Sequence, residues 1–80
     1  MSTDRNLVLY YRPTCPFCMK VLDFMKSRGI ELELRNISED TDAAQTLVAV
    51  GGKHQVPCLF IDGAPLYESG DIIAWLDANV

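Results

Sequence analysis

Two cysteines separated by two residues, in the motif Cys15-Pro16-Phe17-Cys18, constrain this chain more than any other feature. The apolar run Leu7–Tyr11 before them is typical of a strand buried on both faces. The residues after them have helical spacing, and Pro16 suits the first position of a helix because its missing N–H would be unpaired there anyway. Both cysteines therefore lie at a predicted strand-to-helix junction. The unpaired N–H groups and partial positive charge of a helix N-terminus favour a thiolate at Cys15.

The second cysteine lies on the apolar side of a helix predicted over Pro16–Arg28. Apolar side chains recur along this helix at helical spacing, at Cys18, Val21, Leu22 and Met25. Gly29 follows and suits a left-handed helix cap. The two thiols should therefore differ, with Cys15 accessible and activated and Cys18 shielded and less acidic.

The cysteine pair is open to three interpretations, because it can be a redox pair, half of a zinc site, or two core cysteines. For further zinc ligands of these types the chain offers only Cys58 and His54. A zinc site formed by Cys15, Cys18, Cys58 and His54 would also disable the thiol chemistry. We therefore favour the redox pair and expect no metal site. Cys58 follows Pro57 directly, so we expect it close to the reactive edge, where a redox role competes with that of a small core side chain.

Length, composition and charge exclude several classes of protein. The chain is long enough for one small domain, predicted to span residues 1–80, and its 49% hydrophobic content is enough to build a core. Residues 1–6 are polar and too few for a secretory leader, so we expect a cytoplasmic location. No apolar run approaches the roughly 20 residues of a membrane span, so we expect no membrane partner. The net charge of −4 argues against a nucleic-acid partner.

The middle of the chain contains a strand pattern followed by a helix pattern. Apolar and charged side chains alternate over Ile30–Ile37, which predicts a strand with one solvated face. Ser38–Thr41 are capping and acidic residues, typical of a helix start, and Gly51-Gly52 ends that helix. Three apolar residues mark its buried face: Ala43, Leu47 and Val50. A strand on each side of the first helix predicts a βαβ unit with parallel strands and a right-handed crossover.

The next segment is predicted to form a β-hairpin. A third strand pattern covers Pro57–Ile61, and a fourth covers Ala64–Tyr67. The pair Asp62-Gly63 between them is a strong hairpin signal. Pro65 cannot donate a backbone hydrogen bond, so the fourth strand suits an edge of the sheet.

The chain ends in a predicted helix over Gly70–Ala78, for which Ser69 is a good N-cap. This helix is expected to bury four apolar side chains: Ile72, Ile73, Trp75 and Leu76. The predicted fold class is α/β. It has a four-stranded mixed sheet, with its first two strands parallel and its last two forming a hairpin, flanked by three helices.

The chain resembles the glutaredoxin family in three separate places. They are the Cys-Pro-Phe-Cys motif on the first strand-helix turn, the pair Val56-Pro57 entering the third strand, and Ser69-Gly70-Asp71 at the start of the last helix. The resemblance extends from about Leu7 to Leu76. It implies a thioredoxin-like fold that binds glutathione and reduces disulfides with it. Within this resemblance, Cys15 matches the nucleophile and Cys18 the resolving thiol.

The same resemblance implies a set of glutathione-binding residues. They are Arg12, Phe17, Val56, Pro57, Ser69, Gly70 and Asp71. In the family the position of Arg12 faces the glycyl carboxylate, and that of Phe17 borders the groove. Val56 matches the residue whose backbone pairs with the tripeptide, and Pro57 matches a proline that is cis. The start of the last helix matches the part that holds the γ-glutamyl end.

Elementary chemistry agrees with these roles. A tripeptide with two carboxylates is suited by a guanidinium at one end and helix amides at the other. An extended peptide can pair with the backbone of Val56, and Asp71 can pair with the γ-glutamyl ammonium. The sequence also departs from the common family pattern, with Gln55 where threonine is usual and Tyr67 and Glu68 where glycines are usual. Glu68 and the following serine are similar to the glutathione-binding corner of the N-terminal domain of glutathione S-transferases.

The predicted function is that of an enzyme, a glutathione-dependent thiol-disulfide oxidoreductase acting through Cys15 and Cys18 on protein disulfides and protein-glutathione mixed disulfides. Such a redox centre serves electron transport and cell redox homeostasis. Glutathione would be a co-substrate, with no bound cofactor, and the protein a monomer. Two alternatives remain, a redoxin that receives electrons from a flavoprotein reductase and a non-enzymatic module that binds glutathione or an iron-sulfur cluster. Arg12 and Asp71 favour glutathione over the first, and Pro16 makes cluster binding less favourable.

Overall fold

The computed structural model describes residues 6–80 of the chain, and the prediction about a leader rests mainly on residues outside that range. The elements follow in the order β1 (Leu7–Tyr11), α1 (Pro16–Arg28), β2 (Glu33–Asn36), α2 (Thr41–Gly51), β3 (Cys58–Ile61), β4 (Ala64–Tyr67) and α3 (Ser69–Asn79). The strands form one sheet in the order β2-β1-β3-β4. β1 pairs parallel with β2 and antiparallel with β3, and β3 pairs antiparallel with β4. The predicted α/β fold class is confirmed.

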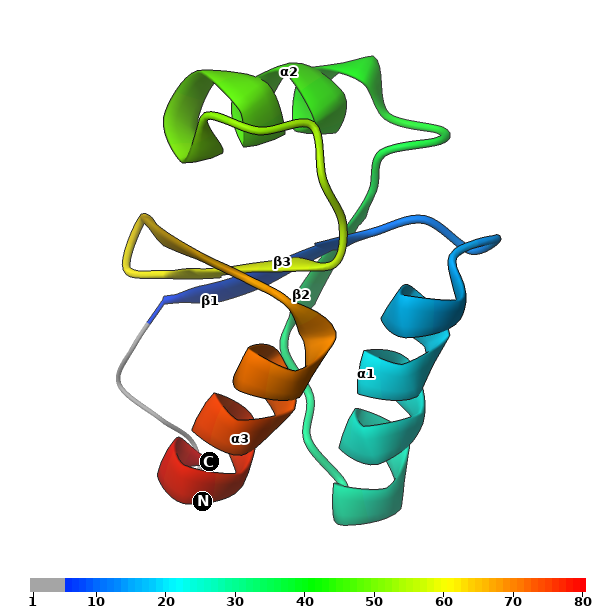
Figure 1. Cartoon of the computed structure of the whole chain (residues 1–80), viewed down its shortest axis with the longest axis vertical. Helices are drawn as coiled ribbons and strands as arrows, with labels where there is room; N and C mark the ends of the chain where they lie inside the picture. The colour runs from blue at the N-terminus through cyan, green and yellow to red at the C-terminus, as the bar shows by residue number, and fades with distance from the viewer. Residues whose placement is uncertain (1–5) are drawn as a thin grey trace.

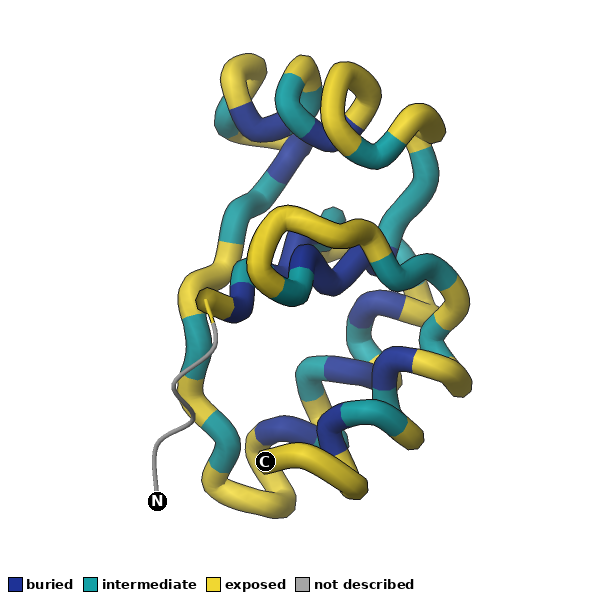
Figure 2. Tube along the Cα trace, turned by 90° about the vertical axis from the view of Figure 1, so that its left-hand side faces the viewer, coloured by how far each residue is buried: buried dark blue, intermediate teal, exposed yellow. Residues whose placement is uncertain are grey.

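Helices cover both faces of the sheet (Figure 1). α1 and α3 lie on one face and α2 lies on the other. Because β1 alternates its side chains between the two faces, Leu9 packs with α1 and α3 while Tyr10 packs with α2. In each helix the buried positions are on the side turned towards the sheet, and exposed positions are on the outside (Figure 2). β1 is therefore buried on both faces, as its continuous apolar run predicts.

α1 begins and ends where local residues specify. Cys15 is its N-cap, in an extended conformation, and Pro16 occupies the first turn. Gly29 ends the helix at φ 68°, where its N–H and that of the next residue bond back to the last turn. The left-handed glycine cap is thus confirmed, because only a residue without Cβ adopts this φ at little cost.

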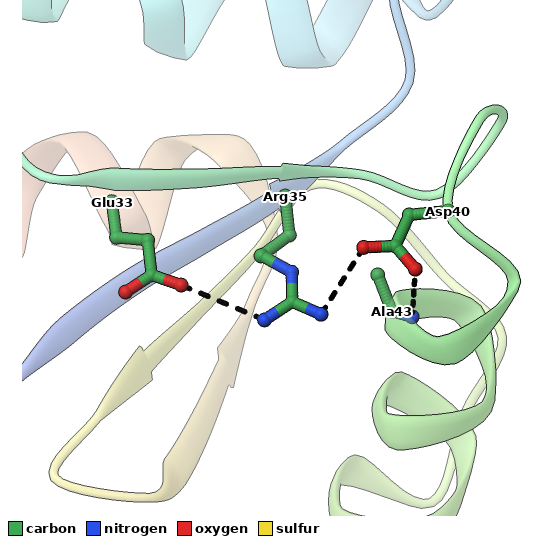
Figure 3. A network of polar contacts seen from close by, with 4 residues as sticks. All are labelled: Glu33, Arg35, Asp40 and Ala43. Carbon is green, nitrogen blue, oxygen red and sulfur yellow. Dashed lines mark hydrogen bonds and ion pairs between the residues drawn. The ribbon is translucent and has the colours of Figure 1, made fainter.

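α2 begins at a side-chain cap tied to the neighbouring strand. The Asp40 carboxylate accepts a hydrogen bond from the Ala43 N–H at 3.2 Å and pairs with Arg35 of β2 at 3.2 Å. Arg35 also pairs with Glu33, at 3.6 Å (Figure 3). The expected buried face is correct at its first two positions but wrong at Val50, which is 54% exposed. Val50 lies in the last turn, where the next residue, Gly51, is the one that lies against Tyr67 and Phe60 of the sheet.

β2 is shorter than the predicted strand Ile30–Ile37. Ile30 and Leu32 pack against the core shared by α1 and α3 before pairing with β1 starts at Glu33. Leu34, expected to be buried, is 43% exposed, in keeping with the position of β2 at the edge of the sheet. The alternating pattern identified the apolar contacts correctly but overstated the length of hydrogen-bonded strand.

The hairpin between β3 and β4 matches its sequence signal. Asp62 and Gly63 both have positive φ, at 52° and 88°, as a two-residue turn of this kind requires. β4 is an edge strand, and Pro65 lies in it opposite Phe60. The predicted edge position of this proline is confirmed.

The start of α3 corrects the sequence prediction. Ser69 is the first helical residue, and the N-cap is Glu68, at φ 74° and ψ 121°. Within residues 6–80, α3 receives no side-chain cap hydrogen bond, so Ser69 does not cap the helix. The positive φ of Glu68 turns the chain one residue early, which places the Ser69 side chain inside the first turn.

α3 also buries fewer side chains than expected. Ile72 and Leu76 are fully buried, whereas Ile73 and Trp75 are only partly buried against the same core. The contact with the sheet therefore follows the narrower stripe of positions four residues apart. Among the described residues, no helix combines the length and the apolarity that crossing a membrane requires.

Candidate active site

The first cysteine of the motif lies partly exposed at the start of α1. Its thiol donates to the Val56 carbonyl, with 3.9 Å between Sγ and oxygen. Burial alone would raise the pKa of the Cys15 thiol, but hydrogen bonds from the Cys18 N–H, the Cys18 thiol and the Phe17 N–H, with the charge of Arg12, outweigh it. The net effect is a lowered pKa, so the helix start favours the thiolate as predicted.

The second cysteine has the opposite environment. Cys18 is fully buried, and burial raises its pKa to about 11. The Arg12 N–H lies 3.5 Å from its sulfur, but this contact does not offset the burial. The predicted contrast between an activated Cys15 and a shielded Cys18 is confirmed.

A groove of ≈ 250 Å³ lies beside the Cys15 thiol. It is lined by Phe17, Gln55, Val56, Pro57, Glu68 and Ser69. Val56, whose carbonyl accepts from the Cys15 thiol, is one of the lining residues, so the groove lies next to the reactive sulfur. The peptide bond between Val56 and Pro57 is cis, as predicted.

The structure brings together part of the predicted set of glutathione-binding residues. Four of them line the groove: Phe17, Val56, Pro57 and Ser69. Arg12 is half-buried at the end of β1, and its charge acts on the Cys15 sulfur. Gly70 and Asp71 are exposed in the first turn of α3, outside the lining.

Two lining residues are absent from the predicted set of glutathione-binding residues, although the sequence likens Glu68 to a glutathione-binding corner of glutathione S-transferases. Gln55 and Glu68 face each other, and the Gln55 amide donates to the Glu68 carboxylate at 3.2 Å. Both stand out in the sequence as departures from the common family pattern. That signal was available, but a departure does not by itself show that a side chain lines a groove.

Cys58 lies away from the reactive edge, contrary to expectation. It is fully buried beneath α2, in the cluster that includes Tyr10 and Leu47. Burial raises its pKa to about 11, and Tyr67 is its register partner on β4. The reason is the alternation of β3, which sends Cys58 to the face of the sheet opposite α1.

The ligand types considered for zinc are not gathered in one place. Among residues 6–80, no three His, Cys, Asp or Glu side chains are grouped so that they could hold a metal ion. Cys58 is separated from the motif by the sheet, and His54 is exposed on the loop before β3.

Comparisons with known proteins agree with this geometry. The Glutaredoxin family model matches residues 7–65. A probable glutaredoxin of Synechocystis is 33% identical over 75 residues, covering 92% of this chain and 85% of that protein. A solved thioredoxin-like protein has a TM-score of 0.76 and 25% identity, covering 91% of this chain and 96% of the other. The thioredoxin-like fold is therefore confirmed.

A glutathione S-transferase also matches, as the Glu68 corner predicted. The solved structure of a rice glutathione S-transferase in complex with glutathione has a TM-score of 0.76 and 28% identity. The match covers 98% of this chain but only 34% of that protein. The likeness thus concerns one part of the transferase.

Proposed function

Because the chain belongs to the glutaredoxin family and so has a thiol-disulfide oxidoreductase role, we propose that it is an enzyme that reduces protein disulfides and protein-glutathione mixed disulfides with glutathione. The observation that carries this proposal is the position of the Cys15 thiol, at the start of α1 and in contact with the groove residue Val56, and its lowered pKa agrees with that position. A thiolate at neutral pH is the attacking species in thiol-disulfide exchange, and the adjacent groove offers a place for the substrate.

The proposed reaction begins at the Cys15 thiolate. It attacks the glutathione sulfur of a mixed disulfide, the bond to the protein sulfur breaks, and the released protein thiolate takes up a proton. Cys15 is then joined to glutathione. The thiolate of a second glutathione attacks that sulfur, which gives oxidised glutathione and returns Cys15 as a thiolate.

Protein disulfides would require the second cysteine. After Cys15 attacks such a disulfide, Cys18 loses its proton and attacks the Cys15 sulfur, which releases the substrate dithiol and leaves a Cys15–Cys18 disulfide. Glutathione then reduces that disulfide. The high pKa of Cys18 suits this role, because a protonated Cys18 does not compete for the substrate in the first step.

The groove supports glutathione as the co-substrate. Phe17 and Pro57 provide apolar walls, and Val56 has a backbone that an extended peptide can pair with. Arg12, whose charge acts on the Cys15 sulfur, and Asp71, in the first turn of α3, carry charges opposite to those of the two ends of glutathione. The match to a transferase solved in complex with glutathione supports the same ligand. No bound cofactor is required in this scheme, and we propose a single cytoplasmic domain over residues 1–80 that acts as a monomer.

The decisive experiment is the glutathione-dependent reduction of a small glutathione mixed disulfide, coupled to glutathione reductase and NADPH. We expect turnover that is abolished in Cys15→Ser and retained in Cys58→Ala, a control that removes a thiol buried on the opposite face of the sheet from α1. Full activity of Cys15→Ser, or no turnover by folded and reduced unmodified protein, would refute the proposal.

A second variant separates the two routes. We expect Cys18→Ser to keep the reduction of the mixed disulfide, since glutathione itself resolves Cys15 there. The same variant should lose most of its activity on a protein disulfide, because that route needs the resolving thiol. Equal loss on both substrates would contradict the assigned role of Cys18.

A further inference from the structure

The connection between α2 and β3 supplies one side of the groove. It runs from the end of α2 to the start of β3 (Figure 1) and carries Gln55, Val56 and Pro57 of the lining. Its middle residues, Lys53 and His54, are exposed. Pro57 is buried and Val56 packs against the core, so the exposed stretch before them is the part whose position depends on other contacts.

Tyr67 of β4 holds this connection at Lys53. Its hydroxyl donates to the Lys53 carbonyl at 3.2 Å, and the Lys53 ammonium lies 5.5 Å from the centre of its ring. The strand that carries Tyr67 is itself fixed, because Tyr67 pairs with Cys58 of β3 and β3 pairs with β1. Tyr67 therefore joins the connection to the rigid sheet.

The last residue of α2 leaves room for the Tyr67 hydroxyl. A Cβ at Gly51 would collide with the hydroxyl oxygen of Tyr67 and would lie 3.3 Å from the adjacent ring carbon. Gly51 is helical, so the absence of a side chain there is not required by its own backbone. The small residue is explained by the space that the tyrosine occupies.

The neighbour of Tyr67 makes a second tie. Glu68 accepts from the Gln55 amide at 3.2 Å, so two adjacent residues of the β4–α3 corner hold two alternate residues of the connection. The next residue along the connection is Val56, whose backbone faces the Cys15 sulfur.

We propose that Tyr67 is a positioning residue, which latches the Lys53 carbonyl and thereby holds Val56 and Pro57 where they can bind glutathione. This latch rests on the proposed function of the groove. Tyr67 is absent from the groove lining and contacts no reacting atom. When the latch is lost, the connection spends part of its time in other positions, and the apparent affinity falls by the fraction that remains competent.

The test is Tyr67→Phe, which removes only the hydroxyl. We expect KM for the glutathione mixed disulfide to rise roughly two- to tenfold, the range for loss of one neutral hydrogen bond. We expect kcat and the rate of Cys15 alkylation by iodoacetamide to stay unchanged, because the thiol environment is not altered. Amide hydrogen exchange at residues 53–56 should become faster. Tyr10→Phe is the matched control, since it removes a hydroxyl from the same core cluster on a different strand.

A second variant tests the latch from the other side. Gly51→Ala should displace the tyrosine hydroxyl and raise KM in the unmodified protein. In the Tyr67→Phe background the added Cβ meets no hydroxyl, so the same change should have a much smaller effect. Additive effects of the two changes would overturn the proposal.

The outcomes separate the latch from the proposed function. An unchanged KM and unchanged exchange in Tyr67→Phe overturn the latch, as does a fall in kcat together with slower alkylation, which would place Tyr67 in the chemistry. If the unmodified protein shows no glutathione-dependent turnover, the proposed function has failed. The latch is then tested by the amide hydrogen exchange rates of Tyr67→Phe alone. Faster exchange at residues 53–56 then supports the latch, and unchanged exchange overturns it.

Discussion

Two helices begin beside the groove, and their N-termini are built in opposite ways. α1 begins after Cys15, whose backbone is extended at φ −91° and ψ 118°, with Pro16 in the first turn. α3 begins after Glu68, at φ 74° and ψ 121°, a conformation that residues with side chains rarely adopt. The N-terminus of α1 is formed by residues whose own conformational preferences favour it. The N-terminus of α3 instead requires Glu68 to adopt a backbone conformation that is unfavourable for a residue with a side chain.

The difference between the two helix N-termini shows which parts of the chain determine the reactivity of Cys15 and which determine the shape of the proposed binding groove. Every group that lowers the pKa of Cys15 lies within three residues of it in the chain, so the reactive end is specified locally. The corner at Glu68 is held by Gln55, thirteen residues away in the chain. The proposed recognition end therefore depends on tertiary contacts, and strain there is tolerated because those contacts determine the conformation.

The largest effect is expected in the relative reactivity of the two motif thiols, which tests whether residues near Cys15 in the chain activate it. We expect iodoacetamide at pH 7 to modify Cys15 at least about tenfold faster than Cys18, because the pKa of Cys15 lies below 9.0 and that of Cys18 is about 11. Full burial of Cys18 widens the difference. Peptide mass spectrometry after partial alkylation measures both rates.

The pH dependence of this reaction gives its control. Alkylation of Cys15 should slow as pH falls through its lowered pKa, because the thiolate is being protonated. Cys58, with a pKa of about 11 and full burial, should behave like Cys18 and serves as an internal standard. Equal reactivity of the three thiols would contradict the local account of activation.

The corner is tested by replacing its strained residue. We expect Glu68→Gly to raise the free energy of unfolding by about 1 kcal/mol, since glycine adopts the observed φ freely, even after its greater loss of backbone freedom is counted. The same change should weaken glutathione binding, because it removes a groove residue and its bond to Gln55. Urea unfolding and the KM for the mixed disulfide measure the two effects.

Glu68→Ala is the matched control for that experiment. It also removes the carboxylate and the bond to Gln55, but it keeps a Cβ on the strained backbone. The difference in stability between the glycine and alanine variants therefore measures the backbone strain at this position minus the greater loss of backbone freedom of glycine. Equal stability of the two would show that the strain is no larger than that entropic cost.

The sequence predicted most of the fold because its signals were local. β1, α1, the Gly29 cap and the Asp62-Gly63 turn are each specified by a few adjacent residues, and all four are where they were expected. The same locality explains the correct contrast between Cys15 and Cys18, since a helix start and an apolar stripe are both readable from spacing.

The errors concern features that depend on distant parts of the chain. Leu34 is exposed on a strand at the edge of the sheet, and the strand order depends on pairing with distant parts of the chain, which nothing near Leu34 encodes. Ser69 has the chemistry of an N-cap, but the turn at Glu68 starts the helix before it. Gln55 lines the groove and contacts that same corner, thirteen residues away in the chain, which no local pattern indicates.

A smaller effect is expected at the charge beside the reactive thiol. Arg12→Gln should slow Cys15 alkylation at pH 7 by roughly two- to threefold, because the guanidinium is the least of the groups that lower the pKa of Cys15, and partly exposed charges act weakly. Lys20→Gln removes a positive charge from the exposed side of α1 and should leave the rate unchanged. A similar loss in both variants would point to overall charge and away from the specific position of Arg12.

The smallest effect on stability is expected at Ser69, and it is compared with the effect of removing the side-chain cap of α2. Ser69→Ala should change the free energy of unfolding by less than about 0.5 kcal/mol, because in residues 6–80 no side-chain cap bond to α3 would be lost. Asp40→Ala is the positive control, since it removes the bond to the Ala43 N–H and should lower Tm by several degrees. Because Ser69 still lines the groove, a higher KM for the mixed disulfide at unchanged stability would assign it to binding. A loss of stability as large as that of Asp40→Ala would instead show that Ser69 caps the helix after all.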